Sequence, residues 1–218
     1  MPSARTADPP QEAVAVAKRY LRRERPLSAL FVLLTVAVFL GTFVATSLVP
    51  AVAVGTLLIV LVRVPIIESH GAVRLRTDED PQSVLESFTG PTPPVLVFQW
   101  GIADEISTGD GTVKYRLSYL FGLRSVEVTV QTQTSHTSAG DRRIEMKVTV
   151  GGQPWSTYVA TVETRDDRTV VEYEYTADRR FGLRRIPQRI VANRYRDEAL
   201  EAQGYVVVDR DEQYGLAI

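Results

Sequence analysis

One apolar run constrains this chain more than any other feature. Residues 27–67 contain a single charged side chain, that of Arg63. The first part of the run, 27–49, has 23 residues, and the second part, 51–67, has 17 residues. Because about 20 apolar residues in a helix cross the hydrocarbon core of a bilayer, we predict a transmembrane helix over each part.

Pro50 separates the two parts, and its role decides the topology. One continuous helix over 27–67 would extend about 60 Å, twice the thickness of the core. Two antiparallel helices joined by a turn at Ser47–Pro50 fit the core instead, because serine and proline favour turns. A cleaved signal peptide is the alternative, but its apolar segment would have about 7–15 residues and no second apolar segment after it.

Basic residues flank the run on its two outer sides and are absent from the turn. They are Lys18, Arg19, Arg22, Arg23 and Arg25 before the run, and Arg74 and Arg76 after it. Positive charge favours the cytoplasmic side of a membrane. The expected localisation is therefore the cell membrane, crossed twice, with both termini and the main domain in the cytoplasm.

Residues 1–26 form a basic arm, with six Lys or Arg and three Asp or Glu. A short helix is predicted after Pro10. It has two interpretations: an interfacial helix that grips anionic lipid, or a solvated flank that only orients the first span. The solvated flank is favoured.

From residue 71 the pattern alternates with a period of two, which is typical of strands with one buried face. The alternating segments are 73–77, 113–121, 126–134, 143–150, 156–164 and 169–177. Short links rich in Gly and Asp join most of them, which predicts hairpins. Between the first two segments, Asp80-Pro81 opens a short helical stretch that the prolines at 91, 93 and 94 end. The sequence therefore predicts a curved antiparallel sheet.

A long C-terminal helix is expected to cover the apolar face of this sheet. Pro187 suits its first turn and Gly204 the position after its end. Residues 205–209 are predicted as a last strand and 210–218 as a tail. The predicted fold class is α+β: a two-helix transmembrane hairpin, then an antiparallel sheet covered by one long helix.

Residues 71–209 resemble the START-like, or helix-grip, superfamily, also called SRPBCC, which includes polyketide cyclases and lipid-transfer proteins. The resemblance is carried by GQPWSTYVATVET at 152–164 and FGLRRIPQRIVANRYRDEALEAQGY at 181–205. The chain is also similar to membrane-anchored members in halophilic archaea. The resemblance implies a helix-grip domain and an apolar or lipid-like ligand, and it carries no catalytic signature. The segment 78–100 is short and proline-rich for the two full helices of that fold.

Aromatic residues at strand spacing are the candidate ligand-binding set. They are Trp100, Tyr115, Tyr119, Phe121, Trp155, Tyr158, Tyr173, Tyr175 and Tyr195. The alternative is that these side chains are ordinary core.

An arginine cluster near the start of the C-terminal helix is the candidate membrane-surface contact. Its members are Arg179, Arg180, Arg184, Arg185 and Arg189. Basic residues near anionic headgroups contribute roughly 1 kcal/mol each; the alternative is a solvated helix entry. Residues 69–218 carry 18 Lys or Arg and 22 Asp or Glu, so nucleic acid is not an expected partner.

The residue types exclude several chemistries. The chain has no cysteine, and its two histidines, His70 and His136, lie far apart in the sequence. No metal site, cofactor or catalytic residue is therefore expected, and the protein is not expected to be an enzyme. The predicted function is a membrane-anchored binding module for an apolar or lipid-like ligand at the cytoplasmic face. The alternative is a structural or interaction protein with a closed core that recruits an unknown protein partner at the membrane.

Overall fold

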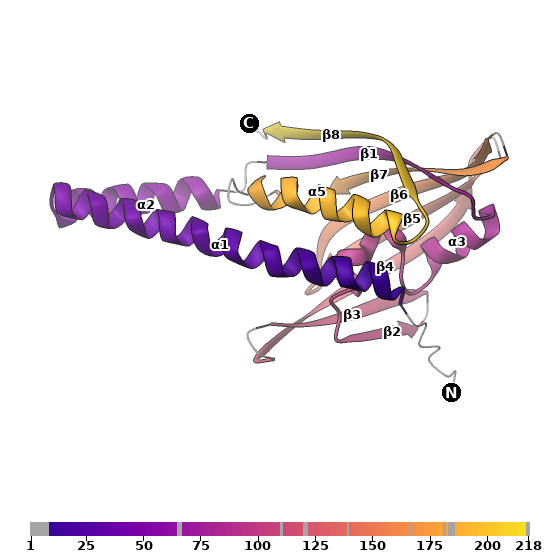
Figure 1. Ribbon diagram of the computed structural model, residues 1–218, viewed down its shortest axis with the longest axis horizontal. Helices are drawn as coiled ribbons and strands as arrows, with labels where there is room; N and C mark the ends of the chain where they lie inside the picture. The colour runs from indigo at the N-terminus through magenta and orange to yellow at the C-terminus, as the bar shows by residue number, and fades with distance from the viewer. Residues whose placement is uncertain are drawn as a thin grey trace.

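The computed structural model describes residues 9–64, 67–109, 111–119, 122–138, 140–165, 167–180, 182 and 186–216. A body of sheet and helices occupies one end of the molecule, and a two-helix hairpin projects from it (Figure 1). The body contains a large antiparallel sheet and several helices, so the predicted α+β class is confirmed. Its arrangement is consistent with a helix-grip fold.

The sheet has eight strands in the order β2-β3-β4-β5-β6-β7-β1-β8, and the neighbouring pairs are antiparallel. The strands are β1 (Ile67–Thr77), β2 (Glu105–Gly109), β3 (Thr112–Tyr119), β4 (Arg124–His136), β5 (Arg142–Val150), β6 (Gln153–Arg165), β7 (Arg168–Ala177) and β8 (Val206–Leu216). Alternating burial gives the sheet one packed face: Val128 and Val130 of β4 are buried, as are Ile144, Met146 and Val148 of β5.

Three strands depart from the prediction. β1 begins at Ile67, although 51–67 was predicted as a membrane span and the strand only over 73–77. β2 was not expected, because Ile106 is the only large apolar residue in it. β8 runs to Leu216, so residues assigned to a tail are strand. The second half of β8 is polar and shows no apolar alternation. What places it in the sheet is backbone pairing with β1, from Ile67 opposite Leu216 to Arg76 opposite Val206.

Short helices fill the space against the packed face. They are α3 (Pro81–Thr89), the 3-10 turn η1 (Pro94–Leu96) and α4 (Val97–Trp100). Asp80 caps α3 by accepting hydrogen bonds from the amides of Gln82 and Ser83, each at 3.0 Å. Val84, Phe88 and Trp100 of these helices lie in the same buried cluster as the strand residues.

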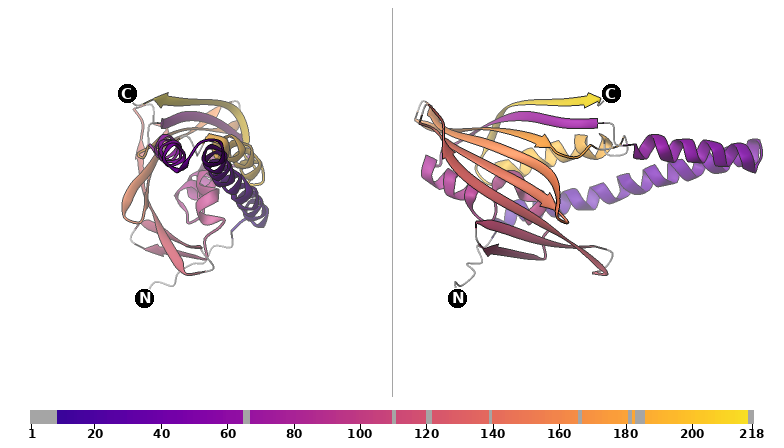
Figure 2. Two further views of the ribbon diagram at one scale, coloured as in Figure 1. Left: turned by 90° about the vertical axis from the view of Figure 1, so that its left-hand side faces the viewer. Right: turned by 180° about the vertical axis from the view of Figure 1, so that it is seen from behind.

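Two long helices cover the concave side of the sheet. α5 (Ile186–Glu201) is the predicted C-terminal helix, and Gly204 just beyond its end has φ +84°. The first half of α1 (Gln11–Ala45) lies beside α5 and against the same side (Figures 1 and 2). Ala13, Val16 and Ala17 of α1 are buried in the core. One side of the described part of the basic arm therefore packs inside the body, while Lys18, Arg19, Arg22 and Arg23 on its other side are exposed.

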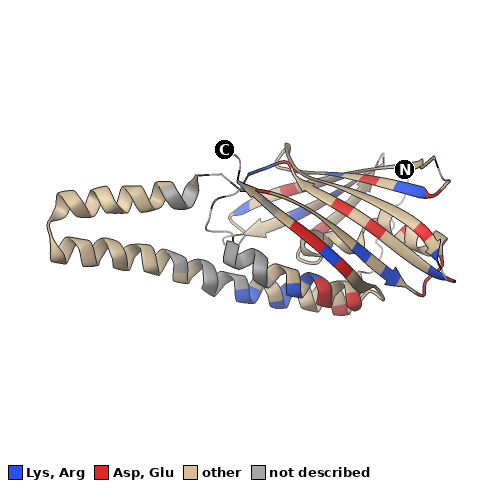
Figure 3. Cartoon of the chain, turned by 90° about the horizontal axis from the view of Figure 1, so that it is seen from above, with Lys and Arg blue, Asp and Glu red and all other residues tan. Residues whose placement is uncertain are grey.

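The second half of α1 and α2 (Leu48–Arg63) form the projecting hairpin. The turn is at Thr46 and Ser47, and Pro50 lies inside the first turn of α2. The described hairpin residues beyond the body carry no charge in Figure 3. Their apolar side chains are exposed; Val44 is 84% and Val49 78% exposed.

The predicted membrane spans need a correction. In the part of the chain that the structure describes, no helix combines the length and the hydropathy that crossing a membrane requires. α2 has 16 residues, about 24 Å at the rise of an α-helix, against a core of about 30 Å. α1 is longer, but its first half belongs to the body. The predicted transmembrane hairpin and cell-membrane localisation, with cytoplasmic termini, are therefore wrong.

Candidate ligand-binding interior

Two of the predicted aromatic residues are structural members of the core. The Trp100 indole nitrogen donates to the carbonyl of Pro93 at 2.8 Å, and the Tyr115 hydroxyl donates to that of Pro91 at 2.9 Å. Both side chains are buried. These two hydrogen bonds hold the proline-rich segment before α4 against the core, and the Pro93 carbonyl also accepts from the amide of Leu96 at 2.9 Å.

Three other members of the set do not join a common site. Tyr119 ends β3 and is 47% exposed. Trp155 is half-buried near the start of β6, and its carbonyl accepts from the amide of Asp178. Phe121 lies outside the described residues.

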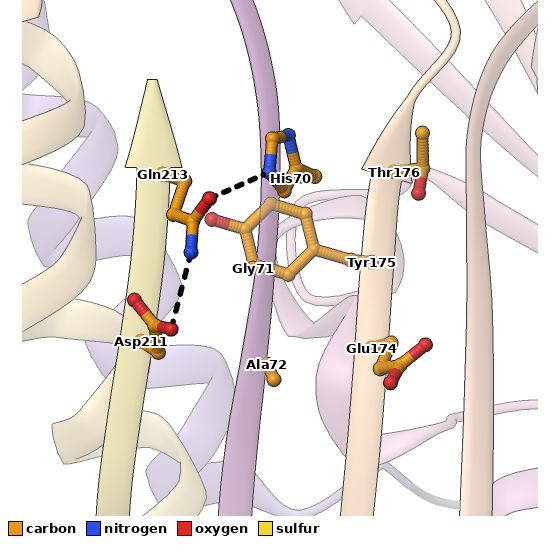
Figure 4. Close-up of a pocket in the computed structure, with 8 residues that line it drawn as sticks. All are labelled: His70, Gly71, Ala72, Glu174, Tyr175, Thr176, Asp211 and Gln213. Atoms are coloured by element: carbon orange, nitrogen blue, oxygen red, sulfur yellow. Dashed lines mark hydrogen bonds between the residues drawn. The ribbon is translucent and has the colours of Figure 1, made fainter. Parts of the chain in front are cut away.

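The remaining strand tyrosines come together on the inner face of β6 and β7. Tyr158 is directly opposite Tyr175, and Tyr173 is opposite Ala160. The rings of Tyr158 and Tyr175 are 6.2 Å apart between centroids. The Tyr175 ring extends from β7 across Gly71 of β1 (Figure 4). A Cβ at position 71 would lie 2.9 Å from this ring, so only glycine leaves room for it there.

α5 places a cation over these rings. The guanidinium carbon of Arg196 lies 5.9 Å from the centroid of Tyr175, within the range of a cation–π contact. We call Ser156, Tyr158, Tyr173, Tyr175 and Arg196 the tyrosine–arginine cluster.

An ion network joins α5 to β8 beside this cluster. Arg210 binds Glu212 at 2.7 Å and also contacts Asp197. Asn193 donates to Glu212 at 2.6 Å. Arg196 lies 3.9 Å from Glu212. Among the described residues, the two arginines thus face two carboxylates.

Two hydroxyls of the cluster are buried without a hydrogen-bond partner among the described residues: those of Tyr173 and Ser156. Tyr173 is 1% exposed. Burial raises the pKa of the Tyr173 hydroxyl to about 12, although the charges of Arg196 and Arg210 oppose the shift. A buried polar group without a partner costs about 1–3 kcal/mol, and such groups in folded proteins call for a water, an ion or a ligand.

Tyr195 belongs to a different place, the seam between α1 and α5. Its ring centroid is 5.9 Å from that of Tyr20 and 5.8 Å from the guanidinium carbon of Arg23. Tyr20 in turn stacks on Phe98 of α4 at 4.6 Å.

The arginine cluster is only partly described. Arg180 binds Glu68 at 2.8 Å, and Arg179 contacts the Gln153 side chain. Arg184 and Arg185 lie outside the described residues. Arg189 is within α5, and its side chain also lies outside them.

A cavity of about 390 Å³ opens over β7, β1 and β8, and Tyr175 and Gly71 are among the residues that line it (Figure 4). His70 contacts Gln213 there at 3.1 Å, and Gln213 donates to Asp211 at 3.3 Å. No group of side chains that could hold a metal ion occurs among the described residues. The inner cluster is therefore the stronger candidate site, because within the described part of the chain it combines buried aromatic rings with two unpartnered hydroxyls.

Sequence reasoning named the three strand tyrosines but missed Ser156, Arg196 and the ion network. Alternation alone indicates that Ser156 shares a face with Tyr158. The sequence has no signal that selects Arg196 from the many arginines of 179–196, because that selection depends on the rotation of α5 over the sheet.

Comparisons with known proteins add little to this geometry. No family model and no curated protein matches the sequence. The Mll3558 protein from Rhizobium loti is 23% identical, over 63% of this chain and 98% of its own, with a TM-score of 0.40. A conserved protein from Geobacillus kaustophilus is 14% identical, over 62% and 91%, with a TM-score of 0.39. Ara h 8.0201 is 11% identical, over 61% and 96%, with a TM-score of 0.38. Likeness at this level establishes neither a family nor a function.

Proposed function

We propose that the protein is a non-catalytic binding module that holds a small apolar molecule between the sheet and α5. The ligand's polar end would accept hydrogen bonds from the tyrosine–arginine cluster. The observation that carries the proposal is the pair of buried, unpartnered hydroxyls of Tyr173 and Ser156. A ligand acceptor beside the Tyr173 hydroxyl would give this buried donor a partner.

The surroundings favour a flat, apolar ligand body. Tyr158 and Tyr175 present aromatic rings, and Ala160 and Met146 are apolar neighbours on the same face. Ligand sites commonly combine an apolar lining with a few precisely placed polar groups.

The charges favour a neutral polar end, such as a ketone. Arg196 and Arg210 are already balanced by Asp197 and Glu212. A carboxylate would add an uncompensated buried charge, which is costly. A carbonyl oxygen accepts hydrogen bonds without adding charge.

The exposed hairpin supports a second candidate function, an interaction protein with a closed core. Monomeric proteins rarely expose a large contiguous apolar surface, and such a surface commonly marks an interaction site. Several large side chains also fill the body, including Trp100, Tyr115 and Phe88.

A neutral fluorescent ketone, prodan, tests the first function on the full chain. The variant Tyr173→Phe removes one donor and keeps the ring, so its affinity for prodan should fall about three- to tenfold, the equivalent of one hydrogen bond. Tyr115→Phe is the matched control, since that hydroxyl already has a partner, and its affinity should match the parent.

A second probe distinguishes binding in the proposed site from adsorption of the dye on the apolar hairpin. A dimethylaminonaphthalene without the ketone has no acceptor for Tyr173, so its binding should be equal in parent and Tyr173→Phe. If prodan also binds both proteins equally, the proposed site is excluded, and the interaction function becomes the better account.

A further inference from the structure

We infer that the first half of α1, residues 11–23, is a removable stopper that closes the interior in which the proposed ligand binds. The inference rests on the proposed function. Beside α5, these residues are the second helical cover of the concave side of the sheet (Figure 2). A ligand that reaches the tyrosine–arginine cluster must therefore pass one of these two helices or the ends of the sheet.

The inner contacts of the stopper are close but made by small side chains. Ala13 and Ala17 are fully buried. A Cβ added to Gly101, just after α4, would lie 2.9 Å from the Ala17 methyl group. Small residues on both sides let the helices approach closely, and Val16 is a larger buried side chain of the same stripe.

The outer contacts combine aromatic rings, of which that of Tyr195 is buried, with an exposed ion pair. The Tyr20 ring stacks on that of Phe98 and makes a tilted ring contact with Tyr195. Arg19 pairs with Glu198 of α5, and both side chains are well exposed. Exposed ion pairs add little to stability and weaken with salt.

The seam between α1 and α5 is also open. A cavity of about 660 Å³ lies along it, lined by Arg19, Arg23, Arg194, Tyr195, Asp197, Glu198 and Glu201. Most of these side chains are charged, so this side of the seam is polar. The seam between the stopper and α5 is thus buried at Tyr195 and open along its charged rim.

A weak point lies just beyond the stopper. Pro26 falls within α1, and proline has no amide hydrogen, so the carbonyl of Arg22 receives no helical hydrogen bond there. Kinks in helices concentrate at such positions. The first half of α1 can therefore tilt away from the body about Pro26 while the rest of the helix stays intact.

A crosslink tests the stopper, because the natural chain has no cysteine. In the full chain, Arg19→Cys and Glu198→Cys place one thiol on α1 and one on α5, and a short bismaleimide joins them. The association rate of prodan should fall at least tenfold on crosslinking, relative to the same variant left unlinked.

The matched control is the pair Glu105→Cys and Arg116→Cys. These residues are exposed and directly opposite each other in β2 and β3, so the crosslink is similar but leaves α1 free. Its prodan association rate should not change.

The outcomes separate the two ideas. If the α1–α5 crosslink leaves the association rate unchanged while prodan binding still depends on Tyr173, the stopper is refuted and the proposed function stands. If the parent shows no Tyr173-dependent binding, the proposed function fails and the stopper fails with it.

Discussion

At the scale of single residues, hydrogen-bond partners distinguish two buried tyrosines that look alike in the sequence. Tyr115 and Tyr173 both stand at inward positions of alternating strands. Tyr115 donates to the carbonyl of Pro91, whereas Tyr173 has no partner among the described residues. The alternation predicted that both rings face inward. It could not predict which hydroxyl would meet a carbonyl, because that depends on the path of the proline-rich segment.

This difference predicts opposite effects on stability. Tyr173→Phe removes an unpartnered hydroxyl and should raise the free energy of unfolding of the ligand-free protein by about 1 kcal/mol. Tyr115→Phe leaves the Pro91 carbonyl without its donor and should lower it by about 1–2 kcal/mol. Urea denaturation of the two variants beside the parent measures both. Equal destabilisation by the two changes would show that the Tyr173 hydroxyl has a partner in solution.

At the scale of elements, the sequence predicts those elements whose side-chain pattern reflects burial on one face. Strands β3 to β7, α3 and α5 fall in this group. It misses β2 and the second half of β8, whose places depend on backbone pairing at the edges of the sheet. It also misreads the first half of α1, since a helix with several basic residues resembles a solvated flank. Ala13, Val16, Ala17 and Tyr20 recur at helical spacing and are the signal that one side of it is buried.

Gly71 of β1 lies between β7 and β8, close to the Asp211 carbonyl of β8 and to the Tyr175 ring of β7. Gly71→Ala would put a Cβ 2.8 Å from the Asp211 carbonyl oxygen and 2.9 Å from the Tyr175 ring. We expect a loss of about 1–3 kcal/mol, as for other overpacked sites, and weaker prodan binding because the ring must move. Gly109→Ala in β2 is the control, since nothing lies within 4 Å of its Cβ. Thermal unfolding that shows equal midpoints for the two variants would contradict the close packing at Gly71.

At the scale of the whole molecule, α1 is the one element that belongs to both parts. Its first half is buried in the body, and its second half lies in the exposed apolar hairpin (Figures 1 and 3). Any partner that holds the hairpin therefore acts on the helix that covers the proposed ligand site. Pro26 lies between the two halves and limits how rigidly they are joined.

Replacing this proline tests the connection between the two parts. Pro26→Ala lets residue 26 donate to the Arg22 carbonyl and should stabilise α1 by about 1–2 kcal/mol, part of the roughly 3 kcal/mol that proline costs inside a helix. A stiffer α1 tilts less readily, so prodan association should slow while its Tyr173-dependent affinity persists.

Pro50→Ala is the matched control. Pro50 is in the first turn of α2, where the amides have no helical acceptor, and the first helical bond runs from Ala51 to Ser47. Stopped-flow fluorescence and thermal unfolding measure the two effects, and an equal response of both variants would rule out Pro26 as the flexible point of α1.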